Sequence, residues 1–434
     1  MKIAPFVLAG ALPLVATIGR AQDAPAPPHQ APERRLALDP ASALANGPWG
    51  FTLTTFDGYD QIRADDQAGT LSAAAADFLQ RSGQQIGLSP RFNVTKNHGK
   101  SVFSFAGDST SAYYALADRM LTDANASARQ SMTIGRNAAV SATESFGYAP
   151  YQSLGLFPGL DMPTGTDVVA PSSPTFEQGL TLSQVYRYSV SGQLSSPLTN
   201  RTTLSVDYQR STTLAADTTA TSRYQEIGAR LLHRTSQSFG YHTGYAYAQS
   251  GPQKLHHLRI GIDGRKVLSR SRRTVFSFGT DSTLVRRPAT SLAPRTEFRL
   301  LGNADLDQFI GRTWSARVSY RRDVAMIEGY AAPVFREFVT AGLAGTFNRR
   351  TTAGVNGSYV LADLPEQSTD QRDHALIGSA WFQVAIARSL TVFGKYSYYQ
   401  HGFELQAAQQ LNLLPQFTRN SVQAGLVLVL TPRR

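Results

Sequence analysis

The sequence contains no cysteine, and only 17% of its 434 residues are charged. Without cysteine there is no disulfide framework, no thiol nucleophile, and no zinc or iron–sulfur site with cysteine ligands. Long apolar runs of helical period are also missing beyond about the first 20 residues. The mean hydropathy of -0.23 excludes a bundle of membrane-spanning helices. A soluble chain of this length would normally divide into about two to four domains with such helical runs. The composition therefore points away from an ordinary soluble protein.

The first residues have the pattern of an export signal. A lysine precedes an apolar run from Ile3 to Ile18, and small residues lead up to Ala21. We predict a secretory signal peptide over residues 1–21, because the run contains two prolines and is shorter than the roughly 20 residues that a spanning helix requires. Residues 22–48 are rich in proline and show no apolar period, which predicts a flexible periplasmic leader.

From residue 49 onward, the dominant pattern is an alternation of period two. In 180–194 the even positions are mostly apolar or aromatic, and the odd positions are mostly Ser, Thr, Arg or Gln. The segments 297–307 and 314–323 divide in the same way, with Leu301 as the one exception in the first. Glu144 breaks the rule in the opposite sense, because it falls on the apolar phase of its segment, and the sequence offers no reason for it.

The alternating segments are too long for a soluble sandwich or propeller. Strands in such folds usually have about 5 to 6 residues, whereas these segments are two to three times as long. Aromatic residues gather towards the segment ends, as expected of a girdle at the membrane surface. The clearest groups are Tyr241, Tyr245 and Tyr247, and Tyr396, Tyr398 and Tyr399.

The connections predict the architecture. Short turns alternate with longer connections at 60–77, 117–125, 151–177, 213–221, 250–253, 287–295, 327–333, 363–373 and 403–415. This predicts an all-β fold over 49–434, a transmembrane antiparallel up-and-down barrel of about 18 strands in the bacterial outer membrane. Short turns would face the periplasm and longer loops the outside, and a count of 16 strands stays open. The longest loop, 151–177, is expected to be either a plug or a surface loop.

Charge falls mainly on the polar phase. The net charge of +11 first suggests nucleic acid, but the basic residues are dispersed along the strands, so no nucleic-acid partner is expected. Charges at the bilayer midplane cost about 2 to 4 kcal/mol if they face lipid, so they should line the lumen. They can form cross-strand ion pairs or a selectivity surface for a polar or anionic solute, and we expect a mixture. The candidates are Arg187, Asp207, Glu226, Arg230, Arg234, Arg259, Asp263, Arg265, Asp281, Glu297, Arg299, Asp305, Asp307, Arg317, Arg321 and Asp323.

No pattern indicates an enzyme. Hydrolase elbows, phosphate-binding loops, zinc-protease helices and calcium loops are absent from the sequence. His256 and His257 are adjacent, and adjacent strand residues point to opposite faces, so they cannot share a metal. We expect no catalytic residue, metal or cofactor.

The segment Ser145-Phe146-Gly147-Tyr148-Ala149-Pro150-Tyr151, before the longest loop, resembles a segment of large outer-membrane barrels found with bacterial exopolysaccharide and exosortase (PEP-CTERM) loci. The resemblance implies a pore or accessory barrel for polysaccharide secretion. Its partners would be a polysaccharide, a periplasmic export component, the outer-membrane assembly machinery and membrane lipid. Two alternatives stay open: a general or solute-selective diffusion porin, and a structural or adhesion barrel that conducts nothing.

Overall fold

The structure is a computed structural model, and it describes residues 48–64, 82–135, 137–150, 184–215, 221–251, 253–269, 273–286, 296–325, 333–363, 373–402 and 416–431. The predicted signal peptide, the leader up to residue 47 and the 151–177 loop lie outside these ranges. No helix in the described ranges is long and apolar enough to cross a membrane. The strands are β1 (Trp49–Ala64), β2 (Gly83–His98), β3 (Ser101–Tyr114), β4 (Arg119–Ile134), β5 (Ala138–Ala149), β6 (Val185–Pro197), β7 (Thr202–Ala215), β8 (Thr221–Arg234), β9 (Phe239–Ser250), β10 (Gln253–Val267), β11 (Thr274–Arg286), β12 (Thr296–Ile310), β13 (Trp314–Ala325), β14 (Val334–Thr346), β15 (Thr351–Asp363), β16 (Asp373–Ala387), β17 (Leu390–Gly402) and β18 (Gln416–Leu430).

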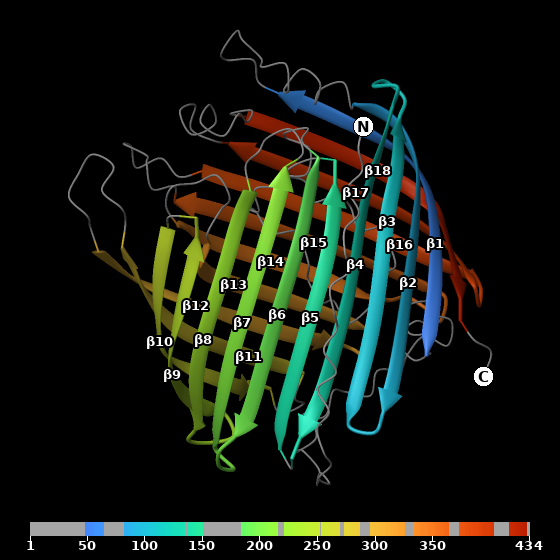
Figure 1. The fold of residues 1–434 in the computed structure, drawn as a ribbon. Coiled ribbons are helices and arrows are strands. Elements are labelled where there is room, and N and C mark those ends of the chain that lie inside the picture. The colour runs from blue at the N-terminus through green and yellow to red at the C-terminus, as the bar shows by residue number, and fades with distance from the viewer. Residues whose placement is uncertain are drawn as a thin grey trace, which may run out of the picture.

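These strands form one closed antiparallel sheet of 18 strands. Each strand pairs with its neighbours in the sequence, and the first strand, β1, also pairs with the last, β18. Figure 1 shows the two walls of the barrel, with blue to green strands in front and orange to red strands crossing behind them, because all strands are tilted. The predicted barrel and its count of 18 are confirmed, and the count of 16 is excluded.

The connection expected at 117–125 is misplaced, and the one expected at 250–253 is in the right place but shorter than expected. β4 already begins at Arg119, so only residues 115–118 join it to β3. That turn is closed by Asp118, which has a φ of 45° and accepts a hydrogen bond of 2.6 Å from the Tyr113 hydroxyl. β9 and β10 are joined by residues 251 and 252 alone, and Gly251 takes the φ of 55° that suits so tight a turn.

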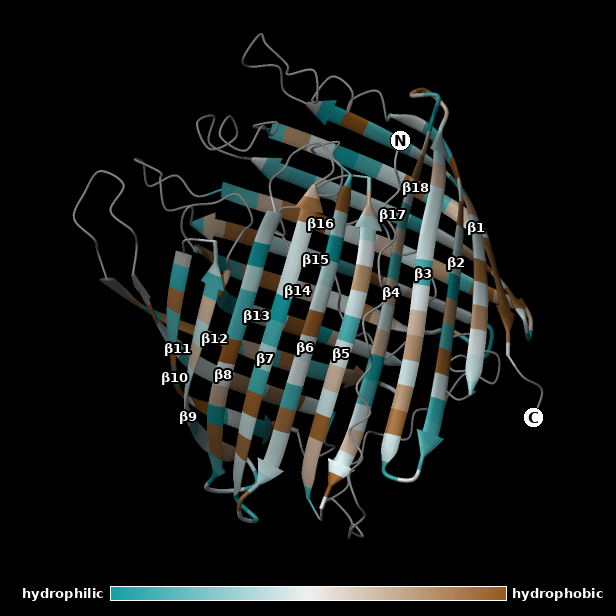
Figure 2. Cartoon of the chain, in the orientation of Figure 1, coloured by the Kyte–Doolittle hydropathy of each residue, from teal (hydrophilic) through white to brown (hydrophobic). Residues whose placement is uncertain are grey.

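The alternation along each strand separates an inward and an outward face. In β18, Arg419, Ser421 and Gln423 are buried on the inward phase, whereas Leu426 and Leu428 are exposed on the outward phase. Figure 2 shows the same mixture of hydrophobic and hydrophilic residues along the strands of the whole barrel. The faces predicted for 186–194, 298–306 and 314–320 agree with the register.

Two residues that depart from the general pattern lie inside the barrel. Leu301, the exception on its polar phase, packs against a buried cluster that includes Leu255 and Phe335. Tyr399 does not belong to the outer girdle as predicted. It is fully buried on the inward face of β17, and its ring centroid lies 5.5 Å from that of His401 and 5.6 Å from that of Phe417.

A buried ion pair lies where the first and last strands meet. The guanidinium of Arg419 on β18 donates to the carboxylate of Asp60 on β1, and the two side chains are 6% and 0% exposed. The amide of Gln85 on β2 donates to the other oxygen of Asp60 at 3.1 Å. The carboxylate therefore links three strands across the closing seam of the barrel.

Aromatic rings packed over glycines surround the same seam. The Phe56 ring of β1 lies over Gly87 of β2, where an added Cβ would come within 2.0 Å of it. Phe393 of β17 lies over Gly425 of β18 in the same manner, with 2.8 Å for an added Cβ. Both rings belong to one buried inward cluster. A ring over a glycine fills the gap left by the missing side chain and fixes the register of the two strands.

We expect Arg419→Met to destabilise the barrel by about 3 to 5 kcal/mol, because it leaves the Asp60 carboxylate buried without its partner. The unheated, compact form on a gel should then unfold at a lower temperature than in the native protein. Arg321→Met is the matched control, since the Arg321 side chain is 65% exposed and its ion pair should contribute about 0 to 1 kcal/mol. Equal unfolding temperatures for the two variants would contradict the role given to the seam pair.

Candidate functional site: the inner wall

The inward side chains of the strands, which we call the inner wall, are largely polar. The strand register places every charged candidate predicted from the sequence on the inward phase, and Glu297 is placed by its backbone position only. The sequence leaves open which of these residues form ion pairs with each other, and the structure gives those contacts. Their role in selecting a solute stays a prediction.

Arg259 on β10 reaches two acidic residues on other strands. Its guanidinium contacts the carboxylate of Glu226 on β8 at 2.7 Å and that of Asp207 on β7 at 3.2 Å. The side chain crosses the inward surface of β9, where Ala246 is fully buried beneath the network. Small residues on the intervening strands therefore allow one arginine to connect strands that are not hydrogen-bonded to each other.

A second group lies on the same wall, nearer to the end of β10 at Val267. Asp263 on β10 accepts from the Arg230 guanidinium at 2.9 Å and contacts Nδ1 of His242 at 2.7 Å. The Arg230 and Asp263 side chains are both about one third exposed, whereas His242 is buried. This group ties β8, β9 and β10 together.

The third group spans β12 to β14. Arg317 contacts Asp305 at 3.0 Å and Asp307 at 3.4 Å, so it stands between two carboxylates of the neighbouring strand. Asp323 is approached by Arg336 at 2.9 Å and by Arg321 at 3.4 Å.

Arg299 completes the paired part of the wall. It lies 3.5 Å from the carboxylate of Asp363, and its guanidinium carbon is 4.8 Å from the centroid of the Phe335 ring. Arg259, Arg299, Arg317 and Arg321 therefore each have an acidic partner. The pairs of Arg259, Arg299 and Arg317 cross between strands, whereas Arg321 pairs with Asp323 on its own strand, and the contacts of all four speak against an unpaired basic track.

Five inward arginines have no acidic partner among the described residues. In the part of the chain that the structure describes, no ion pair or hydrogen bond holds the guanidinium of any of them, which are Arg91, Arg129, Arg187, Arg234 and Arg265. Arg91 and Arg129 were missed from the sequence. The alternation places both of them inward, but it is weak in β2 and β4, so the sequence alone does not single them out as lumen charges.

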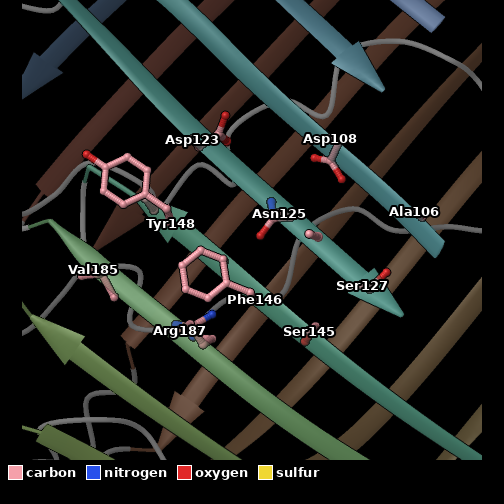
Figure 3. A pocket seen from close by; sticks show the side chains of 13 residues that line it. Ala106, Asp108, Asp123, Asn125, Ser127, Ser145, Phe146, Tyr148, Val185 and Arg187 are labelled. Carbon is pink, nitrogen blue, oxygen red and sulfur yellow. The ribbon is translucent and has the colours of Figure 1, made fainter. Parts of the chain in front are cut away.

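A hollow of about 200 Å³ lies in the wall made by β3 to β6. Figure 3 shows Asp108 of β3, Asp123 of β4 and Arg187 of β6 among the side chains that surround it. Asp123 accepts a hydrogen bond of 2.9 Å from the backbone amide of Thr110, whereas Arg187 is exposed. The hollow therefore carries carboxylates on β3 and β4 and a guanidinium on β6, and no contact joins the two kinds of group in the described residues.

The two adjacent histidines point to opposite faces, as predicted. Nδ1 of His257 lies inside, 3.0 Å from the Thr283 hydroxyl, whereas Nδ1 of His256 lies outside, 2.6 Å from the Tyr245 hydroxyl. Within the described ranges, no group of three or more His, Asp or Glu side chains could hold a metal ion.

No protein-family profile matches the chain, and no curated protein sequence matches it. Solved structures resemble it at low identity. Pseudomonas aeruginosa OpdL has a TM-score of 0.43 and 12% identity, with 89% of this chain and 100% of that chain covered. Acinetobacter baumannii OccAB3 has a TM-score of 0.44 and 10% identity, with 89% of this chain and 100% of that chain covered. The outer membrane protein OpdK of P. aeruginosa has a TM-score of 0.43 and 9% identity, with 88% of this chain and 99% of that chain covered. None of these matches supports an association with exopolysaccharide loci.

The facing of the strands can be tested by labelling, because the chain has no native cysteine. We expect Ser189→Cys and Ser319→Cys to react with a water-soluble thiol reagent in intact outer membranes. Val190→Cys and Val318→Cys should stay unlabelled, since each lies one residue away on the outward face. Equal labelling of all four variants would show that the assigned faces are wrong.

Proposed function

We propose that this chain is a bacterial outer-membrane channel through which small polar solutes diffuse, with a modest preference for anions. The observation that carries the proposal is the closed sheet with a polar, charged inner wall and an apolar outer face. In lipid such a barrel leaves no backbone group of its sheet unpaired, and the charges of its inner wall face water.

The dimensions agree with a membrane location. Strands of 12 to 16 residues, at about 3.3 Å per residue and a tilt of about 40°, span roughly 30 to 40 Å along the barrel axis. The apolar band of an outer-membrane barrel is about 25 Å tall. The outward residues Leu426, Leu428 and Leu430 on β18 are exposed, and a lipid environment would cover them.

The anion preference follows from the unpaired arginines. Arg91, Arg129 and Arg187 lie on three strands of one wall, and unpaired guanidinium groups raise the local concentration of anions in a narrow channel. Asp108 and Asp123 on the same wall oppose this effect, so the preference should be small. The ion pairs of β7 to β14 contribute little net field, because their charges cancel at short range.

The diffusion channel is preferred to a pore for polysaccharide secretion, since no described residue and no comparison favours the latter. A non-conducting structural barrel is separated from both by a conductance measurement. Interaction with a periplasmic export component remains a prediction from the resemblance, and so does insertion by the outer-membrane assembly machinery.

The purified protein should open single channels in a planar bilayer, with a reversal potential in a salt gradient that indicates weak anion preference. Replacing Arg91, Arg129 and Arg187 by glutamine should lower the anion-to-cation permeability ratio by about twofold, because it removes fixed positive charge from the channel wall.

The matched control is Arg230→Gln with Asp263→Asn, which removes one charge of each sign from a contacting pair and should leave the ratio unchanged. A silent bilayer would favour the structural barrel. Native cation preference would reject the role of the unpaired arginines.

A further inference from the structure

The outer face of β4 to β7 carries charge where lipid would be expected. Glu144 lies in the middle of β5, is exposed, and pairs in register with Ala128 and Val190 on the outward phase. Its carboxylate accepts a hydrogen bond from the hydroxyl of Tyr188, and no cation is paired with it in the described residues. A carboxylate in this position needs a partner, because lipid supplies neither water nor counter-charge.

Arg210 on β7 is the second outward charge away from a strand end. It is exposed, and its register partners are Val190 and Gln225. In the described chain its guanidinium makes no hydrogen bond or ion pair. An arginine facing lipid at the midplane costs about 2 to 4 kcal/mol, and less towards the membrane surface.

Two other outward sites within the strands are satisfied by neighbours on the barrel, and the remaining outward charges whose side chains are described lie within three residues of a strand end, which are Arg63, Lys96, Arg223, Lys254 and Lys266. Arg322 and Glu337 are register partners on β13 and β14, with their side chains 3.5 Å apart. The amide of Gln84 donates to Asp57 at 3.2 Å. Glu144 and Arg210 thus differ from Asp57, Arg322 and Glu337, because among the described residues neither of them contacts an opposite charge or an amide donor.

The register makes this face complementary to itself. Val190 on β6 pairs with Glu144 on one side and with Arg210 on the other, so the three residues form one row across the strands. The two charges are separated by two strand spacings, roughly 10 Å. A two-fold axis through β6 would bring Glu144 of one copy opposite Arg210 of the other, and the same contact would form twice.

Small residues lie on one part of the surface around the row, beside the large outward side chains of Phe146 and Tyr188. The outward residues of β4 include Ala124, Ala126 and Ala128, and Gly192 follows Val190 on the outward phase of β6. On β18, by comparison, the outward residues are long and apolar. Small side chains allow two membrane-spanning surfaces to approach closely.

We propose that the outer face of β4 to β7 binds a second copy of this chain in the membrane. In this two-fold contact, Glu144 of each copy pairs with Arg210 of the other, beside the alanines of β4 and the Tyr188 ring of β6. The contact is independent of what the channel conducts.

The test uses the full chain in native outer membranes. Val190→Cys lies near the proposed axis, so oxidation or a short bis-maleimide should give a crosslinked species of twice the monomer mass. Val318→Cys is the matched control, because it is an outward valine on β13 at the opposite side of the barrel. Absence of the Val190→Cys dimer, or an equal yield from Val318→Cys, would overturn the proposal.

Charge exchange tests the pairing itself, in the Val190→Cys background. Glu144→Arg alone and Arg210→Glu alone should each lower the crosslink yield by about tenfold, since like charges then face each other across the axis. The double variant should recover it. Failure of the double variant to recover the yield would reject the pairing.

Each variant is compared only if it keeps the compact, heat-modifiable form on a gel. If the reversals do not fold, Glu144→Gln and Arg210→Gln replace them, each again expected to weaken the dimer. Monomers that retain acidic lipid at Arg210 in native mass spectrometry would show that lipid, rather than a second copy, satisfies this face, and would overturn the proposal.

Discussion

Closure of the sheet is the constraint on which every other feature of this protein depends. An open strand edge cannot exist in lipid, so β1 must pair with β18 even though their residues lie about as far apart in the sequence as the chain allows. This pairing fixes the number of strands and decides which phase of each strand faces inward. The Asp60 and Arg419 pair stabilises it from inside, where a charge can be buried against a partner and an amide. Phe56 and Phe393 fix the register on the two sides of the seam by packing over glycines.

Once the barrel is closed, its inner wall divides into two parts with different electrostatics. On β7 to β14 the acidic and basic residues are close enough to pair, and small residues such as Ala246 let Arg259 reach past its neighbouring strand. On β2 to β6 the basic residues lie apart from the carboxylates. The field that a solute meets therefore arises mainly from the unpaired arginines, which are Arg91, Arg129 and Arg187 in the second part and Arg234 and Arg265 in the first.

The sequence predicts the fold of this protein well, because period-two alternation is a local property. It requires no knowledge of which strands pair, and it places residues such as Arg317 and Val318 on the correct faces. The partners of the inward charges were not predictable, because the strand register and the tilt decide which side chains meet across two or three strands. The tight turn at 115–118 was also missed, and the connection at 251–252 is shorter than expected, because Asp118 and Gly251 each take a positive φ. Tyr399 was misplaced because an aromatic near a strand end fits the girdle and the interior equally well.

The same rule governs charge on both faces: a buried or lipid-facing charge needs either water or a partner. Inward charges satisfy this rule in two ways, because water in the lumen hydrates them and ion pairs give many of them a partner. Outward charges away from the membrane surface satisfy the rule only through a neighbouring side chain, as Arg322 does with Glu337. An arginine can also extend its long side chain towards the headgroups, whereas a glutamate in the middle of a strand is too short to do so. The hydroxyl of Tyr188 supplies one hydrogen bond to Glu144 and no charge. A residue that breaks the alternation in this direction therefore carries more information than one that obeys it, because the barrel alone gives no reason to keep a carboxylate there.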